Sequence, residues 1–406
     1  MGKPKIRFKG YEDDWEQRKF GDLYCKVSEK NDLSFGSDKI ISVANMYFKE
    51  DVKDSSEEYM RTYNVMRLGD IAFEGNKSKN YAHGRFVENT IGDGIVSHVF
   101  DVFRPIAEYD LYFWKYLINN EDVMGRIMTR CTKASTMMTN LVTNDFLKEE
   151  IMVPSLDEQS KIGKYLDDLD NLITLHQRKC EETKSLKKYM LQKMFPENGK
   201  CVPEIRFSGF SDDWEQRKLS EIAIEKLSNG IMNNQANDET GLRHINVINM
   251  YDPDKIHPEK LTFSNYDEDA VKKCNVEWGD IFLTRSSLKP EGIAESNVLL
   301  DSGRFVYDDH LIRLKLDKEK YDPFFVKLNL SGSIFKRQFI ARAKTTAFTT
   351  IGQEDIAECF GLFPEKEEQE KIGTYFSNLD HLITLHQHKC DELQKLKKFM
   401  LQNMFV

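Results

Sequence analysis

Apolar residues alternate at spacings of four and three in two long stretches, about residues 158–195 and their second copy within residues 364–405. This is the spacing of a coiled-coil seam. Apart from Gly163, the first stretch contains no glycine or proline before Pro196, so it permits one helix of roughly 38 residues, or ~57 Å. After positions 183 and 393 the alternation breaks into a stammer. The predicted seam consists of Ile162, Leu166, Leu169, Ile173, His176, Cys180, Thr183, Leu186 and Met190, and of Ile372, Phe376, Leu379, Ile383, His386, Cys390, Leu393, Leu396 and Met400.

Two such helices in one chain bury their narrow stripes most simply against each other. We therefore expect an intramolecular coiled coil. If a pseudo-twofold axis relates the two copies, the helices run antiparallel. The alternative is two independent helices, each packed on its own domain. His176 and His386 fall on the seam, where we favour hydrogen-bonded histidines that set the helix register over a metal pair or a pH switch. Cys180 and Cys390 are predicted to be small buried residues.

Shorter patterns predict mixed α and β structure outside these helices. Residues 41–47 match residues 245–251, and both segments are typical of strands or strand ends. A Gly-Asp turn is predicted at residues 68–71 and again at 278–281. Further strands are expected at residues 98–103 and 310–316, and shorter helices at residues 112–118 and 324–330.

The chain also repeats itself. Residues 3–23 return at 202–222 with 12 of 21 positions identical, and residues 154–195 return at 364–405 with 26 of 42 identical. The stretches between these blocks differ strongly but keep their landmarks in the same order, which indicates one fold with two different surfaces. The predicted class is α+β, with two similar mixed α/β domains joined by two long helices. The expected boundaries are 1–153 for the first domain, 154–195 for the first helix, 196–363 for the second domain and 364–406 for the second helix.

Composition limits what these domains can bind. Of 406 residues, 40% are hydrophobic and 31% charged, which suffices for two folded domains. The formal net charge of −9 argues against a general nucleic-acid coat, so a DNA-binding surface must be local or must be helped by basic partners.

Seven scattered cysteines without a C-x-x-C pair argue against a disulfide framework or a zinc site, and no metal site is predicted. Without an apolar run of ~18 residues or a signal-peptide core, the chain is expected to be cytoplasmic.

Each domain contains two windows that lack acidic residues, at 76–87 and 128–144 in the first and at 282–290 and 335–350 in the second. Their Arg and Lys side chains suit guanine edges and phosphates, their Asn side chains suit adenine, and their hydroxyls suit either. For any single window, a solvated turn is the alternative. The candidate DNA-binding residues are Lys77, Lys79, Asn80, Tyr81, Arg85, Arg130, Lys133 and Ser135, and Arg285, Ser286, Ser287, Lys289, Arg342, Lys344, Thr345 and Thr346.

Two sequence motifs each occur twice in the chain. One is P-x-x-x-E-Q-x-K-I-G, at residues 154–163 and 364–373, where each copy opens a long helix. The other is I-R-F-x-G-x-x-x-D-W-E-Q-R-K, at residues 6–19 and 205–218. These motifs resemble those of the specificity (S, HsdS) subunits of bacterial type I restriction–modification enzymes. The resemblance spans the whole chain, including the order of variable domain, helix, variable domain and helix.

The resemblance implies a noncatalytic subunit whose two target recognition domains each read one half of an asymmetric bipartite site in double-stranded DNA, with the helices spacing the halves. It implies no cofactor in this chain. Two modification subunits would carry S-adenosylmethionine and methylate adenine N6, and restriction subunits would use ATP and Mg to cleave DNA. The bases read, the spacer length and the grooves entered cannot be carried over, since the variable domains diverge too far.

Two other functions remain open at this point. A stand-alone adenine methyltransferase would need [DN]-P-P-[YFW], but the closest match is Asp322-Pro-Phe-Phe325, which fits a turn that opens a helix. The glycines at 92 and 94 do not make a dinucleotide fingerprint, and the chain has no P-loop motif. An assembly adaptor that binds two copies of a protein would explain the repeated helices and the acidic charge. It would not explain the basic, hydroxyl-rich windows.

Overall fold

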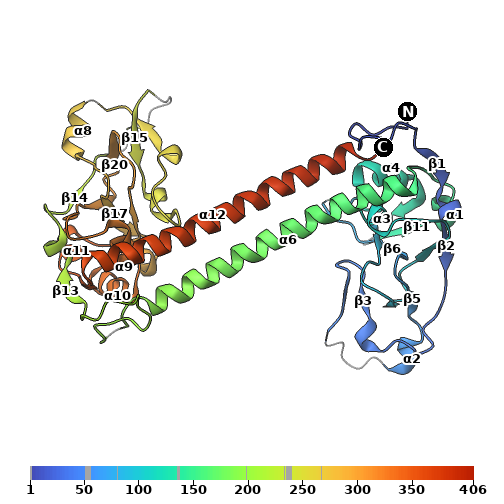
Figure 1. Cartoon of the computed structure of the whole chain (residues 1–406), viewed down its shortest axis with the longest axis horizontal. Helices are drawn as coiled ribbons and strands as arrows, with labels where there is room; N and C mark the ends of the chain where they lie inside the picture. Colours follow the sequence, from blue (N-terminus) through green and yellow to red (C-terminus); the bar gives the residue numbers. More distant parts are fainter. Residues whose placement is uncertain are drawn as a thin grey trace. The chain divides into compact units, whose positions relative to one another are not determined.

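Two compact units make up the chain in the computed structural model (Figure 1), which describes residues 2–406 except 51–55, 80, 135–137, 198, 233, 235–239 and 267. Unit 1 contains residues 1–177 and 388–406, and unit 2 contains residues 178–387. The long helices are α6 (Leu156–Lys193) and α12 (Lys366–Asn403), each of 38 residues, as the sequence predicted. Each unit therefore holds part of each long helix.

The two long helices pack antiparallel within each unit. In unit 1, Leu166 and Ile173 of α6 share a core with Cys390 and Leu393 from the C-terminal half of α12. In unit 2 the roles are exchanged, because the C-terminal half of α6 meets the N-terminal half of α12. There the Cys180 Sγ lies 3.9 Å from the carbonyl oxygen of Ile383. The predicted helix pairing is confirmed, and the alternative of two independent helices is wrong.

The seam departs from the prediction at one matched position. Leu186 and Leu396 were expected to be buried, but they are 44% and 36% exposed. Beyond the stammer the inward face shifts by one residue, which brings Lys187 and Lys397 toward the partner helix. There Lys187 pairs with Asp380 and, in the other unit, Lys397 pairs with Asp170. The physical reason is that a spacing of four from position 183 leads to 187, whereas a spacing of three leads to 186.

Unit 1 is built around a four-stranded sheet of order β2-β9-β6-β7, against which helix α3 packs. Its first strand β1 pairs with β12, which leads into α6. The elements are β1 (Glu16–Lys19), α1 (Phe20–Leu23), β2 (Tyr24–Val27), η1 (Ser37–Lys39), β3 (Ile41–Ser42), β4 (Tyr47–Phe48), α2 (Glu57–Met60), β5 (Asn64–Met66), β6 (Ile71–Glu74), β7 (Arg85–Glu88), β8 (Gly94–Val96), β9 (Val102–Pro105), α3 (Leu111–Ile118), α4 (Glu121–Cys131), β10 (Thr132–Ala134), β11 (Thr139–Leu141), α5 (Thr143–Phe146) and β12 (Glu150–Val153).

Unit 2 repeats this plan with additions. Its four-stranded sheet has the order β14-β21-β17-β19, and β13 pairs with β24 before α12. A second sheet, β16-β15-β20, has its own core around Ile245 and Phe305. The elements are β13 (Glu215–Lys218), α7 (Leu219–Ile222), β14 (Ser228–Asn229), β15 (Leu242–Ile245), η2 (Val247–Tyr251), η3 (Pro258–Lys260), β16 (Thr262–Ser264), α8 (Glu268–Cys274), β17 (Ile281–Thr284), β18 (Ser286–Ser287), η4 (Pro290–Gly292), β19 (Ser296–Val298), β20 (Phe305–Tyr307), β21 (Leu311–Leu314), α9 (Pro323–Leu330), α10 (Ser333–Arg342), β22 (Lys344–Thr345), β23 (Thr349–Thr350), α11 (Gln353–Ala357) and β24 (Phe360–Phe363).

Most of the shorter predicted elements are present. Both Gly-Asp turns precede a strand, and Gly69 and Gly279 adopt φ of 85° and 84°, which favours glycine. The predicted short helices correspond to α3 and α9. The segments 41–47 and 245–251 are strands for only part of their length, since the first turns after Ser42 and the second continues as the 3-10 helix η2. The strands expected from residues 98 and 310 begin later, at Val102 and Leu311.

The repeated motifs fasten each domain to the start of its long helix. Glu158 is fully buried and accepts two hydrogen bonds from Arg7, at 2.6 and 2.8 Å. Gln159 accepts a hydrogen bond from the backbone N–H of Asp110, the N-cap residue of α3. A Cβ on Gly163 would lie 2.5 Å from the Asp110 carboxylate, so glycine allows this close approach. In unit 2, Glu368, Gln369 and Gly373 make the same contacts with Arg206 and Asp322.

None of the helices in the described part of the chain combines the length and the apolar character needed to cross a membrane.

Candidate nucleic-acid interface

The two acid-free windows of unit 1 meet in space although forty residues separate them in the sequence. Asn76, which follows β6, forms a β-bridge with Met138, the residue directly before β11 in the β10–β11 hairpin. The backbone N–H of Thr139 donates to the Gly75 carbonyl at 2.8 Å. A Cβ on Gly75 would lie 2.2 Å from the Thr139 carbonyl oxygen, so this approach requires glycine. We call the described residues of 76–85 and 130–141, that is 76–79, 81–85, 130–134 and 138–141, the loop-hairpin surface of unit 1.

Unit 2 brings its two windows together in the same way. Strand β18, directly after β17, pairs with β23, and β23 pairs with β22 to complete a three-stranded sheet. The backbone N–H of Ile351 donates to the Arg285 carbonyl at 3.0 Å. We call residues 285–292 and 342–350 the loop-hairpin surface of unit 2. In both units, a segment after the central strand and a distant hairpin thus form one surface.

The predicted residues differ in how free their side chains are. Most are exposed, namely Lys77, Lys79, Arg130, Lys133, Arg285, Lys289, Arg342, Lys344, Thr345 and Thr346. Tyr81, Arg85, Ser286 and Ser287 are half-buried. Asn80 and Ser135 lie outside the described residues.

Two predicted arginines in unit 1 are held by carboxylates. The Arg85 Nε donates to Glu74 at 2.8 Å, its Nη2 donates to the Ala44 carbonyl, and its guanidinium lies 5.0 Å from the centre of the Tyr81 ring. The Arg130 Nε lies 3.0 Å from both carboxylate oxygens of Glu149. Both guanidinium groups are therefore engaged in ion pairs, with which a phosphate or a base would have to compete.

The arginines of unit 2 are held more weakly. The Arg285 Nη1 contacts the Asp309 carbonyl at 3.4 Å, and the Arg342 Nη2 contacts the Glu358 carbonyl at 3.4 Å. Within the hairpin, the hydroxyls of Thr345 and Thr349 lie 3.1 Å apart. Contacts of this length with neutral carbonyl groups leave most of the N–H donors of each guanidinium available to another partner.

One matched pair of apolar residues was not among the sequence predictions. Met138 and Phe348 directly precede the buried residues Thr139 and Thr349, and they are 39% and 54% exposed. Apolar side chains in such positions can contact a thymine methyl group or enter between base steps. The available signal was a pair of apolar residues, Met137-Met138 and Ala347-Phe348, that stands between threonines at the same place in both windows.

Comparison with known proteins identifies the family. The family model described as the type I restriction modification DNA specificity domain matches the chain twice, at residues 12–185 and 211–395. The chain belongs to this DNA specificity family. Each match covers one domain together with most of its long helix, so this specificity subunit carries two such domains in one chain.

Individual relatives are similar to this chain over much of its length. The putative type I restriction enzyme MjaX specificity subunit of Methanocaldococcus jannaschii is 24% identical over 419 aligned residues, which cover 95% of this chain and 91% of the relative. The MjaVIII specificity subunit of the same organism is 25% identical over 257 residues, 61% of this chain and 59% of the relative. The crystal structure of the S subunit from M. genitalium aligns with a TM-score of 0.58 and 13% identity over 100% of this chain and 99% of that one, which confirms the fold.

The membership also bears on the stand-alone methyltransferase that the sequence left open. Specificity subunits are not themselves the catalytic chains, and the tetrapeptide at residues 322–325 has a structural role here. Asp322 is the N-cap of α9, and its carboxylate accepts a hydrogen bond from the backbone N–H of Phe325 at 2.7 Å. The predicted turn that opens a helix is confirmed.

Proposed function

We propose that this chain selects the DNA sequence on which a type I restriction–modification complex acts. The loop-hairpin surface of each unit reads one half of an asymmetric bipartite site in double-stranded DNA. The observation that carries this proposal is that both units join two distant acid-free windows into one exposed surface with different side chains. A shared framework with different surfaces suits two different half-sites. Because the chain carries a net charge of −9, its contacts with DNA phosphates must be local, and in this proposal they lie on these two surfaces.

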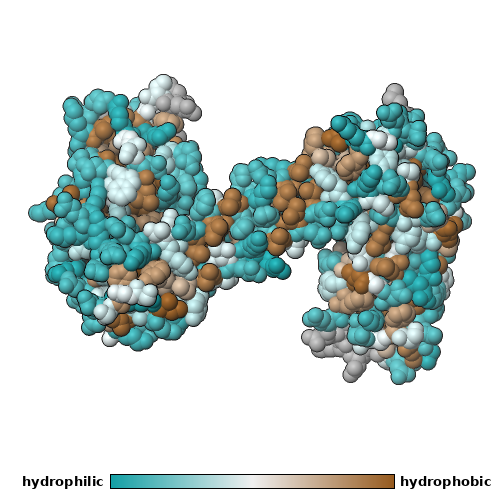
Figure 2. All heavy atoms as spheres, in the orientation of Figure 1, coloured by the Kyte–Doolittle hydropathy of each residue, from teal (hydrophilic) through white to brown (hydrophobic). Residues whose placement is uncertain are grey.

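We further infer that two modification subunits dock on the repeated helices. Several large apolar side chains on α6 and α12 are exposed, and Figure 2 shows hydrophobic atoms on the surface of these helices. Three of them match between the copies, since Leu172, Leu186 and Tyr189 correspond to Leu382, Leu396 and Phe399, all between 36% and 51% exposed. Apolar surface presented twice suits two equal partners. In this proposal S-adenosylmethionine is bound by those partners, and ATP and Mg by the restriction subunits.

The helices set the length of the spacer between the two half-sites in this proposal. Inserting ~4 residues, about one helical turn, into one helix should change the spacer and leave both half-sites unchanged. Genome-wide mapping of methylated adenines measures both quantities at once. An unchanged spacer with altered half-sites would refute the role of the helices as a ruler.

The reading surfaces are tested by exchanging one of them. Residues 342–350 are replaced by those of a relative, and the chain is produced with its modification partners. The methylated motif should change in one half only. Exchange of the largely exposed helix segment 268–273, which lies in the same unit outside the surface, serves as the control and should leave the motif intact.

The result also separates the reading role from that of an adaptor. If the exchange leaves the motif unchanged while methylation continues, the chain joins subunits without reading bases. If purified chain alone methylates DNA, the assignment of catalysis to the partners is wrong.

A further inference from the structure

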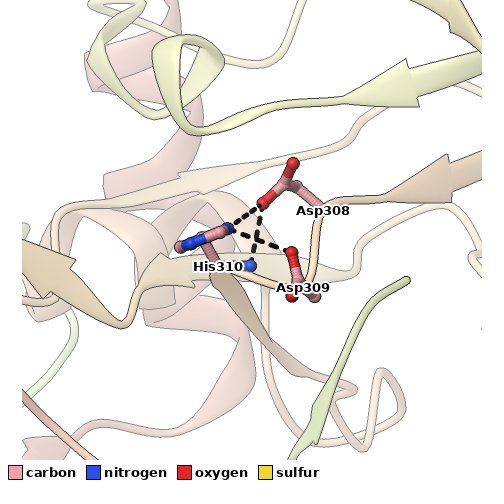
Figure 3. Close-up of side chains that lie close together, drawn as sticks. All are labelled: Asp308, Asp309 and His310. Carbon is pink, nitrogen blue, oxygen red and sulfur yellow. Dashed lines mark hydrogen bonds and ion pairs between the residues drawn. The ribbon is translucent and has the colours of Figure 1, made fainter. Parts of the chain in front are cut away.

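Three metal-ligating side chains converge in the turn between β20 and β21. Figure 3 shows Asp308, Asp309 and His310 pointing toward one another. The His310 Nδ1 lies 2.9 Å from an oxygen of Asp308 and 3.0 Å from an oxygen of Asp309. One ligand atom from each residue lies within 4.8 Å of the others. Such a group occurs on many surfaces without an ion, so a further observation is needed to identify a site.

That observation is a fourth side chain from another strand. His244, on β15, is 0% exposed, and its Nε2 has no hydrogen-bond partner among the residues that the structure describes. This nitrogen faces the turn, 3.9 Å from the second oxygen of Asp308. Asp308 therefore stands between two histidines, with one carboxylate oxygen toward each. A buried ring nitrogen without a partner is unfavourable unless it has a ligand.

The other ring nitrogen of His244 has a hydrogen-bond partner, since the Nδ1 lies 2.7 Å from the Ser264 Oγ. In the tautomer that carries its proton on Nδ1, this nitrogen donates to the hydroxyl and the Nε2 lone pair is free. Metal-bound histidines donate their other ring N–H in the same way, usually to a carboxylate, a backbone carbonyl or water.

We propose that His244, Asp308, Asp309 and His310 bind one divalent transition-metal ion such as Zn²⁺. Two imidazole nitrogens and two carboxylates suit zinc better than Mg²⁺ or Ca²⁺, which prefer oxygen ligands alone. Zinc holds nitrogen and oxygen ligands at ~2.0 to 2.2 Å in a tetrahedron. Binding would therefore require His244 and the three residues of the turn to move toward a common centre.

The ion would act on the neighbouring loop-hairpin surface of unit 2, a consequence that rests on the proposed function. The turn holds Arg285 through two carbonyls, since the Arg285 backbone N–H donates to the His310 carbonyl at 3.0 Å and its Nη1 contacts the Asp309 carbonyl. A bound cation would fix this turn and thereby Arg285. It would also neutralise two carboxylates beside a surface that is proposed to meet phosphates.

Metal binding is tested first on the full chain, made without a histidine tag and treated with a chelator. Zn²⁺ titration by calorimetry should give one equivalent, and Co²⁺ should develop the visible absorption of a site with nitrogen and oxygen ligands. His310→Ala, at a 60% exposed side chain, should weaken binding at least ~10-fold. His244→Asn, which can keep the bond to Ser264, should do the same if circular dichroism shows a folded chain.

His257→Ala is the matched control. His257 also lies between two carboxylates, 2.8 Å from Asp254 and 3.1 Å from Glu259, but these residues belong to one local turn. Its substitution should leave Zn²⁺ and Co²⁺ binding unchanged. Absence of binding to the original chain, or binding that is lost in His257→Ala and kept in His310→Ala, would overturn the site.

The functional consequence has a separate readout. In cells, His310→Ala should reduce methylation wherever the half-site read by unit 2 is required, by the same factor as Arg285→Ala. If Zn²⁺ binding is lost and methylation is unchanged, the metal site stands and its link to recognition is refuted. If Arg285→Ala also leaves the methylated motif and its level unchanged, the proposed reading surface itself is wrong.

Discussion

The two units differ most where they face solvent and least where each domain meets its long helix. At the junction, the same bidentate contact joins Arg7 to Glu158 and Arg206 to Glu368. On the loop-hairpin surfaces, Arg85 is tied to a carboxylate, whereas Arg285 contacts backbone carbonyls. The junction fixes geometry with buried charges. The surface can therefore exchange side chains without disturbing the fold.

Breaking the junction should have the largest effect. Arg206→Ala leaves the fully buried Glu368 carboxylate without its partner, and removal of one member of a buried ion pair destabilises by ~3 to 5 kcal/mol. Hydrogen exchange followed by mass spectrometry should show faster exchange in unit 2 and unchanged exchange in the four-stranded sheet of unit 1. Arg7→Ala should give the reverse pattern.

A matched substitution controls for the loss of charge. Arg217 pairs with Glu215 on the surface, where the two side chains are 45% and 68% exposed. Arg217→Ala should leave exchange in both units unchanged, because solvent screens this pair. Equal loss of protection in Arg206→Ala and Arg217→Ala would contradict the junction as the source of stability.

The sequence predicted the junction helices well because their signal is local. The alternation of four and three apolar spacings, the absence of proline and the Gly163 position lie within one continuous stretch. The error at Leu186 arose where that alternation breaks, since the helix face beyond a stammer depends on what the partner offers. Asp380 and Asp170 provide carboxylates there, and a lysine is favoured over leucine.

The loop-hairpin surfaces were only partly predictable, because they depend on contacts between distant segments. The windows were found from composition, and the structure brings each pair together. The ion pairs of Arg85 with Glu74 and of Arg130 with Glu149 left no sign in the windows themselves, since both acids lie just outside them. The turn at Asp308 likewise gains its fourth group from His244 on another strand.

Single substitutions on the two loop-hairpin surfaces test the proposed DNA contacts of each unit. Lys344→Ala removes an exposed amine from the hairpin of unit 2. Loss of a base contact would weaken binding by ~1 to 3 kcal/mol, about 5- to 150-fold, and relax one position of one half-site. Loss of a phosphate contact would weaken binding to all DNA sequences alike. It would also reduce the slope of the logarithm of the binding constant against the logarithm of the salt concentration by about one.

Lys133→Ala is the counterpart in unit 1. It should affect the other half-site alone. Binding of labelled duplexes that differ in one half at a time, measured at several salt concentrations with the complete complex, separates the two results. If both variants affect the same half, the assignment of one half-site to each unit is wrong.

The aspartates of the two Gly-Asp turns, Asp70 and Asp280, should make the stability of the two units depend differently on pH. Asp70 accepts two hydrogen bonds from Arg104, whereas Asp280 lies 3.8 Å from Arg313. Burial raises the pKa of both carboxyls, and that of Asp280 reaches about 6. Neutral Asp280 contributes its full stabilisation below the pKa of the unfolded chain, near 3.8. This contribution is lost as the pH rises through the folded-state pKa of about 6.

Asp280→Asn removes this dependence while keeping an oxygen for the Glu277 backbone N–H. Relative to the variant, the original chain should lose ~1 to 3 kcal/mol of stability between about pH 4 and pH 7. Urea denaturation at each pH measures the difference. Asp70→Asn should show a smaller change with pH, since Arg104 offsets more of the burial. An equal or larger change in Asp70→Asn would contradict this account.

The lysine–aspartate pairs between the long helices should have the smallest effect and still distinguish the units. The side chains of Lys187 and Asp380 are 15% and 7% exposed, and those of Lys397 and Asp170 are 23% and 32% exposed. Asp170 also accepts a hydrogen bond from the Tyr116 hydroxyl at 2.6 Å. Double-mutant cycles to alanine should therefore give a coupling of ~1 kcal/mol in unit 2 and ~0.5 kcal/mol in unit 1.

Tyr116→Phe should raise the coupling in unit 1 toward that in unit 2, because Lys397 then becomes the main partner of the carboxylate. A coupling in unit 1 that Tyr116→Phe leaves unchanged would show that solvent exposure, and not the shared hydroxyl, sets the difference.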